Sequence, residues 1–254
     1  MLYFKEFGSG QPLVVLHGLF GSSDNWQSLA RVFAEKYHVF IVDQRNHGRS
    51  PHTINTFNYA LMSDDLNQFL SDHDLTNVIL LGHSMGGKSV MQYVMDYGNE
   101  RVDRLIVADI GPKQYPLHHD TILEALTTAN FDVLKTRKEV DQHVSKFIDQ
   151  LGVRQFLLKN LYWIEKTKLA WRFNVDILSR DIANIVDAVD GDAVDIKTLF
   201  IRGASSNYIL DEDLLDILEL FPNAKFDTID GVGHWLHAEA PEIFIKKVHE
   251  FIEN

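Results

Sequence analysis

The chain has 254 residues, 45% of them apolar, which is enough for one large domain or for one domain that carries an insertion. Lys and Arg number 24 against 36 Asp and Glu, and the resulting net charge of −12 disfavours binding to nucleic acid and to anionic membranes. The absence of cysteine excludes disulfides, a thiolate nucleophile and a cysteine metal site.

The first residues, MLYFKEFGSGQP, are too short and too charged before the Gly-Ser-Gly turn to be a signal peptide. No run of 18 apolar residues follows, so we expect no membrane-spanning segment. The expected location is therefore the cytoplasm.

The first half of the chain alternates short apolar runs with helix-length segments. The runs do not alternate between apolar and polar residues, which is typical of strands buried on both faces of a parallel sheet. The expected strands are 13–17, 39–43, 78–82 and 105–109, and the expected helices are 26–36, 58–72 and 85–97.

The pattern changes between residues 112 and 192, where strand-like runs give way to amphipathic segments at 121–130, 139–151 and 153–164. Strands at 198–202 and 225–229 then follow, with helices at 214–220 and 242–252. This order predicts an α/β protein with a mostly parallel, doubly wound sheet. Residues 1–111 and 193–254 are expected to form its core, and 112–192 a helical cap insertion.

The segment Gly82-His83-Ser84-Met85-Gly86 joins an expected strand directly to an expected helix. A serine between two glycines at such a turn is typical of a nucleophile elbow, in which the hydroxyl projects over the edge of the sheet. Asp109 follows the next strand, and His234 follows the last one. The order serine, acid, histidine is that of the α/β-hydrolase triad.

Several phrases in the chain make this resemblance specific. HGLFGSSDNW, DQRNHGRSP, GHSMGGK, WRFN and GHWLHAE occur in this order. The chain resembles the α/β-hydrolase superfamily over essentially its whole length, and within it the small bacterial YbfF-type esterases. The resemblance implies an α/β-hydrolase fold and a serine esterase activity without a cofactor.

The expected roles follow from this resemblance and from acyl-transfer chemistry. Ser84 is the candidate nucleophile, and His234 is the candidate base, because a serine hydroxyl needs an adjacent base. The oxyanion needs two backbone donors, and the family pattern assigns them to the N–H groups of Met85 and Leu19.

The acid of the triad is harder to assign. Most relatives carry it at the position of Ser206, where this chain has no carboxylate. Asp211 comes next, but its position is typical of a helix N-terminus, where acids stabilise the free N–H groups. Asp109 is the preferred candidate, since it ends the strand beside the elbow strand. Ser206 is then expected to support the triad by a hydrogen bond.

Other motifs have less specific interpretations. Arg45 and His47 are expected to tie loops together, and His83 to pack beside its strand. His234 and His237 lack an acidic ligand at metalloprotease spacing, so no metal is expected. GHSMGGKS satisfies the P-loop expression, but no downstream strand with a magnesium-binding acid accompanies it.

The resulting hypothesis is a serine hydrolase of carboxylic acyl esters, with thioesters as a variant, acting as a monomer or homodimer on a small molecule. The alternatives are a C–C bond hydrolase or a menaquinone-pathway-type lyase on the same elbow, or a catalytically silent receptor. The residues expected to bind substrate are Phe20, Phe156, Trp163, Trp171 and Trp235, with Tyr115, Leu157 and Tyr162 as further cap candidates. Those that belong to the insertion could equally form the core of the cap.

Overall fold

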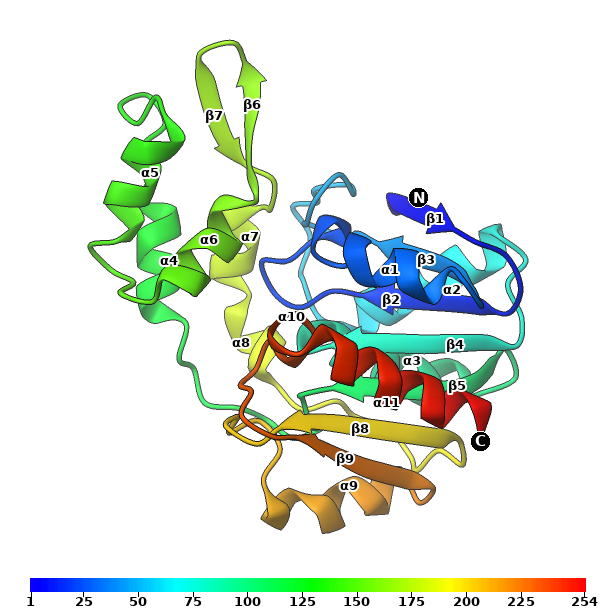
Figure 1. Cartoon of the computed structure of the whole chain (residues 1–254). Helices are drawn as coiled ribbons and strands as arrows, with labels where there is room; N and C mark the ends of the chain where they lie inside the picture. The colour runs from blue at the N-terminus through cyan, green and yellow to red at the C-terminus, as the bar shows by residue number, and fades with distance from the viewer.

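A computed structural model describes residues 1–254 of the chain, and its centre is a seven-stranded sheet (Figure 1). The strand order is β1-β3-β2-β4-β5-β8-β9, and every neighbouring pair is parallel except β1 with β3. This arrangement confirms the predicted α/β-hydrolase fold. The strands are β1 (Phe4–Phe7), β2 (Pro12–Leu16), β3 (His38–Val42), β4 (Val78–His83), β5 (Val102–Ala108), β8 (Lys197–Gly203) and β9 (Ala224–Ile229).

Both faces of the sheet are covered, which explains the continuous apolar runs of its strands. On one face, Leu13 and Val15 of β2 pack in a cluster with residues of α1 (Gln27–Phe33) and α11 (Pro241–Glu253). On the other face, Val14 and Leu16 pack with residues of α2 (Tyr59–Asp72) and α3 (Met85–Tyr97). Figure 1 shows these helices on the two sides of the strands.

The remaining core helices follow the last two strands in the chain. They are the 3-10 helix Asp211–Asp213, α9 (Leu214–Leu220) and the short α10 (Leu236–Glu239), while a 3-10 helix at Ser23–Asn25 precedes α1. None of the helices in the chain combines the length and the apolar composition that crossing a membrane requires.

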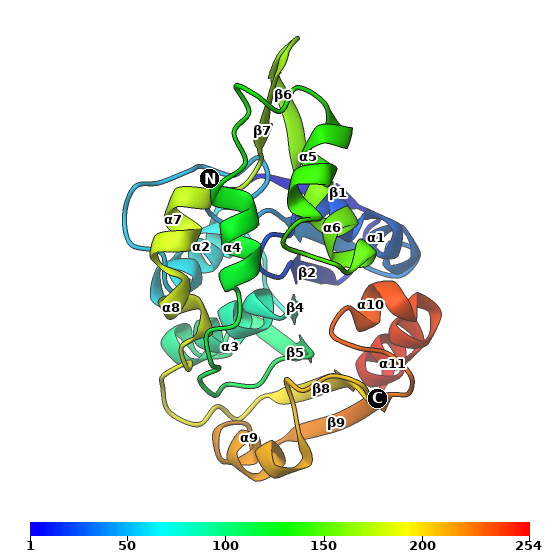
Figure 2. The ribbon, with the colours of Figure 1, turned by 90° about the vertical axis from the view of Figure 1, so that its left-hand side faces the viewer.

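Residues 112–192 lie at the carboxyl ends of the strands, and most of their regular elements are helices (Figure 2). Leu157 and Phe173 from this segment belong to the same apolar cluster as β2 and α3, so the segment packs continuously onto the core. Its elements are α4 (Asp120–Thr127), α5 (Arg137–Val144), α6 (Leu151–Leu158), β6 (Leu161–Glu165), β7 (Lys168–Trp171), α7 (Val175–Arg180) and α8 (Ile182–Val186). That residues 112–192 form a separate cap insertion stays a prediction.

The antiparallel hairpin of β6 and β7 corrects the expectation of a helix over 153–164 and of a cap without strands. The helix α6 ends at Leu158, and the chain then runs through Tyr162, Trp163 and Ile164, which are aromatic and β-branched residues that favour strands. Two turn residues at 166 and 167 join the strands, a length that hairpins prefer.

Candidate active site

Ser84 lies at the sharp turn between β4 and α3, with a φ of 53° and a ψ of −122°. This conformation is strained for a residue with a side chain, and such strain concentrates at functional sites. A Cβ atom at Gly82 would clash with the carbonyl oxygen of Gly86, and one at Gly86 would clash with that of Leu16. The two glycines are therefore required because the backbone segments approach closely around Ser84.

Asp109 follows β5 and is fully buried, and its Oδ2 lies 2.8 Å from Nδ1 of His234. Two groups hold the carboxylate: the N–H of Gly203, the last residue of β8, donates to Oδ1 over 3.0 Å, and the hydroxyl of Ser206, which follows β8, donates to Oδ2. A buried carboxylate needs such donors, since it has lost its hydration. Asp109 is thus fixed with one oxygen directed at the imidazole of His234.

Asp211 does not take part in this arrangement. Its side chain is 87% exposed, begins a 3-10 helix and lies 2.5 Å from the guanidinium of Arg202. The geometry favours Asp109 over Asp211 as the partner of His234.

Tyr208 is a site residue that the sequence analysis did not identify. Its ring stacks on that of His234, with centroids 4.0 Å apart, and its hydroxyl lies 2.8 Å from Nε2 of His118. Burial raises the pKa of Tyr208 to about 12, so the phenol stays neutral beside the imidazole. In the sequence, only its position two residues after Ser206 indicated that Tyr208 lies near the site.

The N–H groups of Leu19 and Met85 donate to no acceptor within the protein, whereas the N–H of Phe20 donates to Nε2 of His47 over 3.2 Å. Burial lowers the pKa of His47 to about 3, so the imidazole is neutral and can accept this bond at neutral pH. The loop after β2 is therefore held in place while the N–H of Leu19 stays free for an oxyanion.

His17 holds the same loop from the other side. Its Nδ1 lies 2.8 Å from the carbonyl oxygen of Gly18, and its Nε2 accepts a bond from the N–H of Gln44 over 3.0 Å. Burial lowers the pKa of His17 to about 4, which keeps this ring neutral as well. The loop residues that precede Leu19 are thus tied to the chain after β3.

A cavity of about 210 Å³ opens beside Ser84 and His234. Three of the five predicted substrate-binding residues line it, namely Phe20, Phe156 and Trp235. Leu157 also lines it, as do Ile122, Val153 and His119, which the sequence analysis did not select. No lysine or arginine is among the lining residues.

The prediction that Trp163 and Trp171 line this cavity is wrong, because both belong to the hairpin that the sequence analysis missed. Trp163 is 47% exposed on β6. Trp171 on β7 is buried instead against Phe131 and Phe173. Tyr162 also lies on the hairpin, with its ring beneath the guanidinium of Arg172.

The P-loop interpretation has no support in the environment of Lys88. This side chain is fully buried, and its Nζ donates to the carbonyl oxygens of Lys113, over 2.7 Å, and Asp187. Desolvation lowers its pKa to about 7. Because Nζ of Lys88 is bonded to the backbone near both ends of the cap segment, it is not free to bind a phosphate.

The remaining histidines of the motif segments have structural contacts. His83 is buried with Nε2 2.8 Å from the carbonyl oxygen of His234, and burial holds its pKa well below the usual range. His237 stacks on the ring of Trp26 at a centroid distance of 4.3 Å. No group of three or more potential metal-ligating side chains is present. Arg45 pairs with Asp65 rather than entering the site.

Comparison with known proteins places this geometry in context. A family model described as the alpha/beta hydrolase fold matches residues 11–145. The chain is 35% identical to "Esterase YbfF" of Escherichia coli, over 97% of this chain and 94% of the relative. It is 36% identical to "sn-1-specific diacylglycerol lipase ABHD11" of Xenopus laevis, over 96% and 80% of the two chains. A solved structure described as "Marine microorganism esterase" superimposes with a TM-score of 0.95 at 42% identity, covering 98% of each chain.

Proposed function

This chain belongs to the α/β-hydrolase family and is a carboxylic ester hydrolase, and we propose that Ser84, His234 and Asp109 form its catalytic triad. The observation that carries the proposal is the 2.8 Å approach of Asp109 Oδ2 to His234 Nδ1 beside the cavity that contains Ser84. A buried acid in this position fixes the tautomer of the imidazole and leaves Nε2 free to accept a proton.

Acylation begins when Nε2 of His234 removes the proton from Ser84 as its Oγ forms a bond to the ester carbonyl carbon. The carbonyl π electrons move to oxygen, and the N–H groups of Leu19 and Met85 donate to the resulting oxyanion. The bond to the alcohol oxygen then breaks, and that oxygen takes the proton from His234. The products of this half are the free alcohol and the acyl group on Ser84.

Deacylation repeats the same steps with water as the nucleophile. His234 removes a proton from water, and the hydroxide oxygen bonds to the acyl carbon of the ester on Ser84. When the tetrahedral intermediate collapses, Ser84 leaves and regains its proton from His234. The carboxylic acid departs, and the two half-reactions require no cofactor.

The lining of the cavity supports ester hydrolysis over the alternative chemistries. A lyase or C–C bond hydrolase on the same elbow would need polar or cationic cap residues that face Ser84. No lysine or arginine lines the cavity, and the only polar cap residues in its lining are His118 and His119. Its aromatic and aliphatic side chains suit uncharged esters. Acyl thioesters undergo the same acyl transfer and belong in the same assay.

The direct test is hydrolysis of p-nitrophenyl esters and matched acyl thioesters by the wild type, Ser84→Ala and a control. Ser205→Ala is the matched control because Ser205 is exposed one residue before the proposed triad support. We expect Ser84→Ala to lose about 10⁴-fold or more of kcat and Ser205→Ala to retain wild-type activity. Undiminished turnover by Ser84→Ala would refute the proposed nucleophile, and no turnover by the wild type would refute the proposed activity.

A further inference from the structure

Two cavities meet at Ser84. Besides the cavity of about 210 Å³, which we term the large cavity, a second one of about 30 Å³ lies beside the serine, the small cavity. Both are lined by Leu19, Ser84, His118, His119 and Tyr208. The two spaces therefore extend from one reaction centre in different directions.

The other lining residues show on which side of Ser84 each cavity lies. His234 and Trp235 line the large cavity and not the small one. Met85, Tyr59 and Ile110 line the small cavity and not the large one. The large cavity is on the side of the proposed base, and the small cavity is on the side of the elbow helix α3.

The chemistry of ester cleavage assigns a substrate group to each side. The carbonyl carbon bears the oxyanion, the leaving alcohol oxygen and the acyl chain. The alcohol oxygen must lie against His234, because it receives the proton held there. The oxyanion is directed at the N–H groups of Leu19 and Met85, and the alcohol oxygen at His234. The acyl chain therefore takes the third direction, which leads away from His234.

On the basis of the proposed function, we propose that the small cavity is the acyl subsite, that it admits acyl chains from acetyl to butyryl, and that the large cavity binds a bulkier apolar alcohol. A cavity needs roughly 10–15 Å³ to hold one water molecule, which is about the size of one heavy atom of a chain. About 30 Å³ therefore accommodates only two or three heavy atoms beyond the carbonyl carbon.

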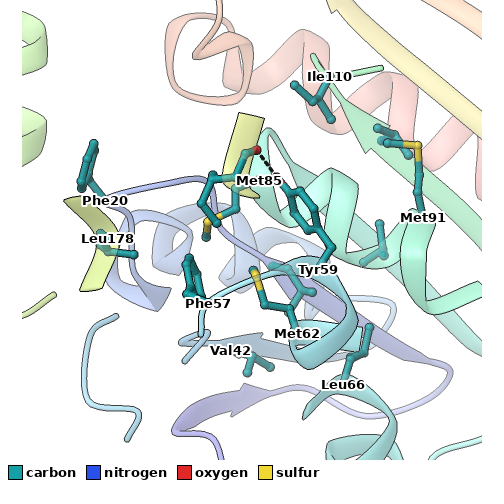
Figure 3. Packing of buried hydrophobic residues seen from close by; sticks show 14 of the residues in the cluster. Phe20, Val42, Phe57, Tyr59, Met62, Leu66, Met85, Met91, Ile110 and Leu178 are labelled. Carbon is teal, nitrogen blue, oxygen red and sulfur yellow. Dashed lines mark hydrogen bonds between the residues drawn. The ribbon is translucent and has the colours of Figure 1, made fainter. Parts of the chain in front are cut away.

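Most of the residues that line the small cavity are apolar, and those that line it alone are closely packed. Tyr59, Met85 and Ile110, which Figure 3 shows among the packed side chains, are each at most 5% exposed. The Tyr59 hydroxyl donates to the carbonyl oxygen of Ile185 over 2.6 Å and the Tyr115 hydroxyl donates to that of Tyr208 over 2.7 Å. Since these bonds join the cap to the core, a longer chain cannot enter without breaking them or displacing close-packed side chains.

The large cavity has the properties that an apolar alcohol requires. The rings of Phe156 and Trp235 lie 5.9 Å apart in its wall, and Val153 and Ile122 add aliphatic surface. Its volume is about seven times that of the small cavity, from about 210 against about 30 Å³. Aryl and branched alcohols fit this space, and charged alcohols would find no lysine or arginine.

Two substrate series test the assignment with the intact protein. In p-nitrophenyl esters from acetate to decanoate, we expect kcat/KM to fall at least tenfold between butyrate and hexanoate. In acetates of methanol, 2-methylpropanol, benzyl alcohol and naphthol, we expect kcat/KM to rise from methyl to the aryl esters. Equal or faster cleavage of octanoate than of acetate would overturn the assignment.

Variants separate the two cavities. Ile185→Ala enlarges only the small cavity, and Val186→Ala is the second variant if the first one fails to fold. We expect either to move the acyl optimum to chains longer by two or more carbons while the order of the alcohols is unchanged. Val153→Ala enlarges only the large cavity. We expect it to change the order of the alcohols and to leave the acyl optimum unchanged. A shift in alcohol preference, and not in acyl preference, by Ile185→Ala would refute the inference.

The two proposals fail in different ways. Absence of Ser84-dependent turnover with every ester would overturn the proposed function and this assignment with it. Ser84-dependent turnover with a preference for long acyl chains and small alcohols would leave the triad standing and overturn only the assignment of the two cavities.

Discussion

The ring of Tyr208 stacks on that of His234, with centroids 4.0 Å apart and planes inclined by 21°. The backbone N–H of Tyr208 also donates to the hydroxyl of Ser206 over 3.3 Å, and that hydroxyl in turn donates to Asp109. One three-residue segment therefore contacts both the imidazole and the carboxylate that orients it. In the proposed triad, this segment therefore supports an acid that follows β5.

Replacing Tyr208 tests whether the stacked ring positions His234. We expect Tyr208→Leu to lower kcat for phenyl acetate by about 10- to 100-fold, because small displacements of a catalytic group cost rates of this order. Tyr208→Phe keeps the ring and is expected to stay within about threefold of the wild type. The measurement is kcat and KM across pH 5–9. Equal losses in both variants would contradict a positioning role of the ring.

Replacing the two candidate acids tests the assignment of the triad. Asp109→Asn is expected to lower kcat by about 10⁴-fold, since an amide at this position stabilises the wrong tautomer of the imidazole. Asp211→Asn changes an exposed residue paired with Arg202 and is expected to change kcat by less than about twofold. Steady-state kinetics on one ester decides between them. The opposite ranking of the two variants would assign the role to Asp211.

We expect alanine substitution to change the free energy of unfolding differently at Gly82, in the elbow, and at Gly152, in α6. In Gly82→Ala the new methyl group would clash with the backbone at Gly86, so we expect a loss of about 3 kcal/mol or more in the free energy of unfolding. In Gly152→Ala the methyl group meets no atom within 4 Å, and the site is helical. That control should gain up to about 1 kcal/mol. Urea unfolding compares them, and a neutral Gly82→Ala would contradict the close approach.

Buried His237 predicts a specific sensitivity to acid. Burial, with a smaller contribution from His234, lowers its pKa from 6.5 to about 3. In the folded state the imidazole of His237 resists protonation, whereas in the unfolded state it takes up a proton near pH 6.5. The contribution of the neutral ring to the free energy of unfolding is therefore fully present above pH 6.5 and is lost as the pH falls towards 3. By pH 5 the loss is about 2 kcal/mol, from 1.5 pH units at about 1.4 kcal/mol each.

The variant His237→Phe should remove this contribution while preserving the stack on Trp26. Its free energy of unfolding should fall by about 2 kcal/mol less than that of the wild type between pH 7 and pH 5. His52→Phe, which changes an exposed loop residue, is the matched control. If His237→Phe shows the same pH dependence as the wild type, the ring is not the source of the acid sensitivity.

The sheet could be predicted from the sequence because its strands are buried on both faces, which leaves continuous apolar runs such as 78–82. The positions of Ser84, Asp109 and His234 after β4, β5 and β9 followed from the same pattern. The short edge strand β1 was not predicted, since it has four residues and no fully buried one.

The cap was harder to predict. A stretch such as 153–164 holds enough apolar residues for a helix or a strand, and only the packing of the cap decides between them. The side-chain directions of Trp163 and Trp171 depend on that choice, so their assignment to the cavity was wrong. Tyr208 and His234 are 26 positions apart in the chain. The closeness of Tyr208 to Ser206 in the sequence indicates that it lies near the site, but its stacking on His234 depends on the fold.

The most direct test of the triad is a crystal structure of the enzyme inactivated by a p-nitrophenyl alkylphosphonate, with the modified peptide identified by mass spectrometry. We expect phosphorus bonded to Ser84 Oγ, the phosphonyl oxygen between the N–H groups of Leu19 and Met85, and His234 still paired with Asp109. Inactivation through a residue other than Ser84, or an adduct whose oxygen contacts neither N–H group, would contradict the account.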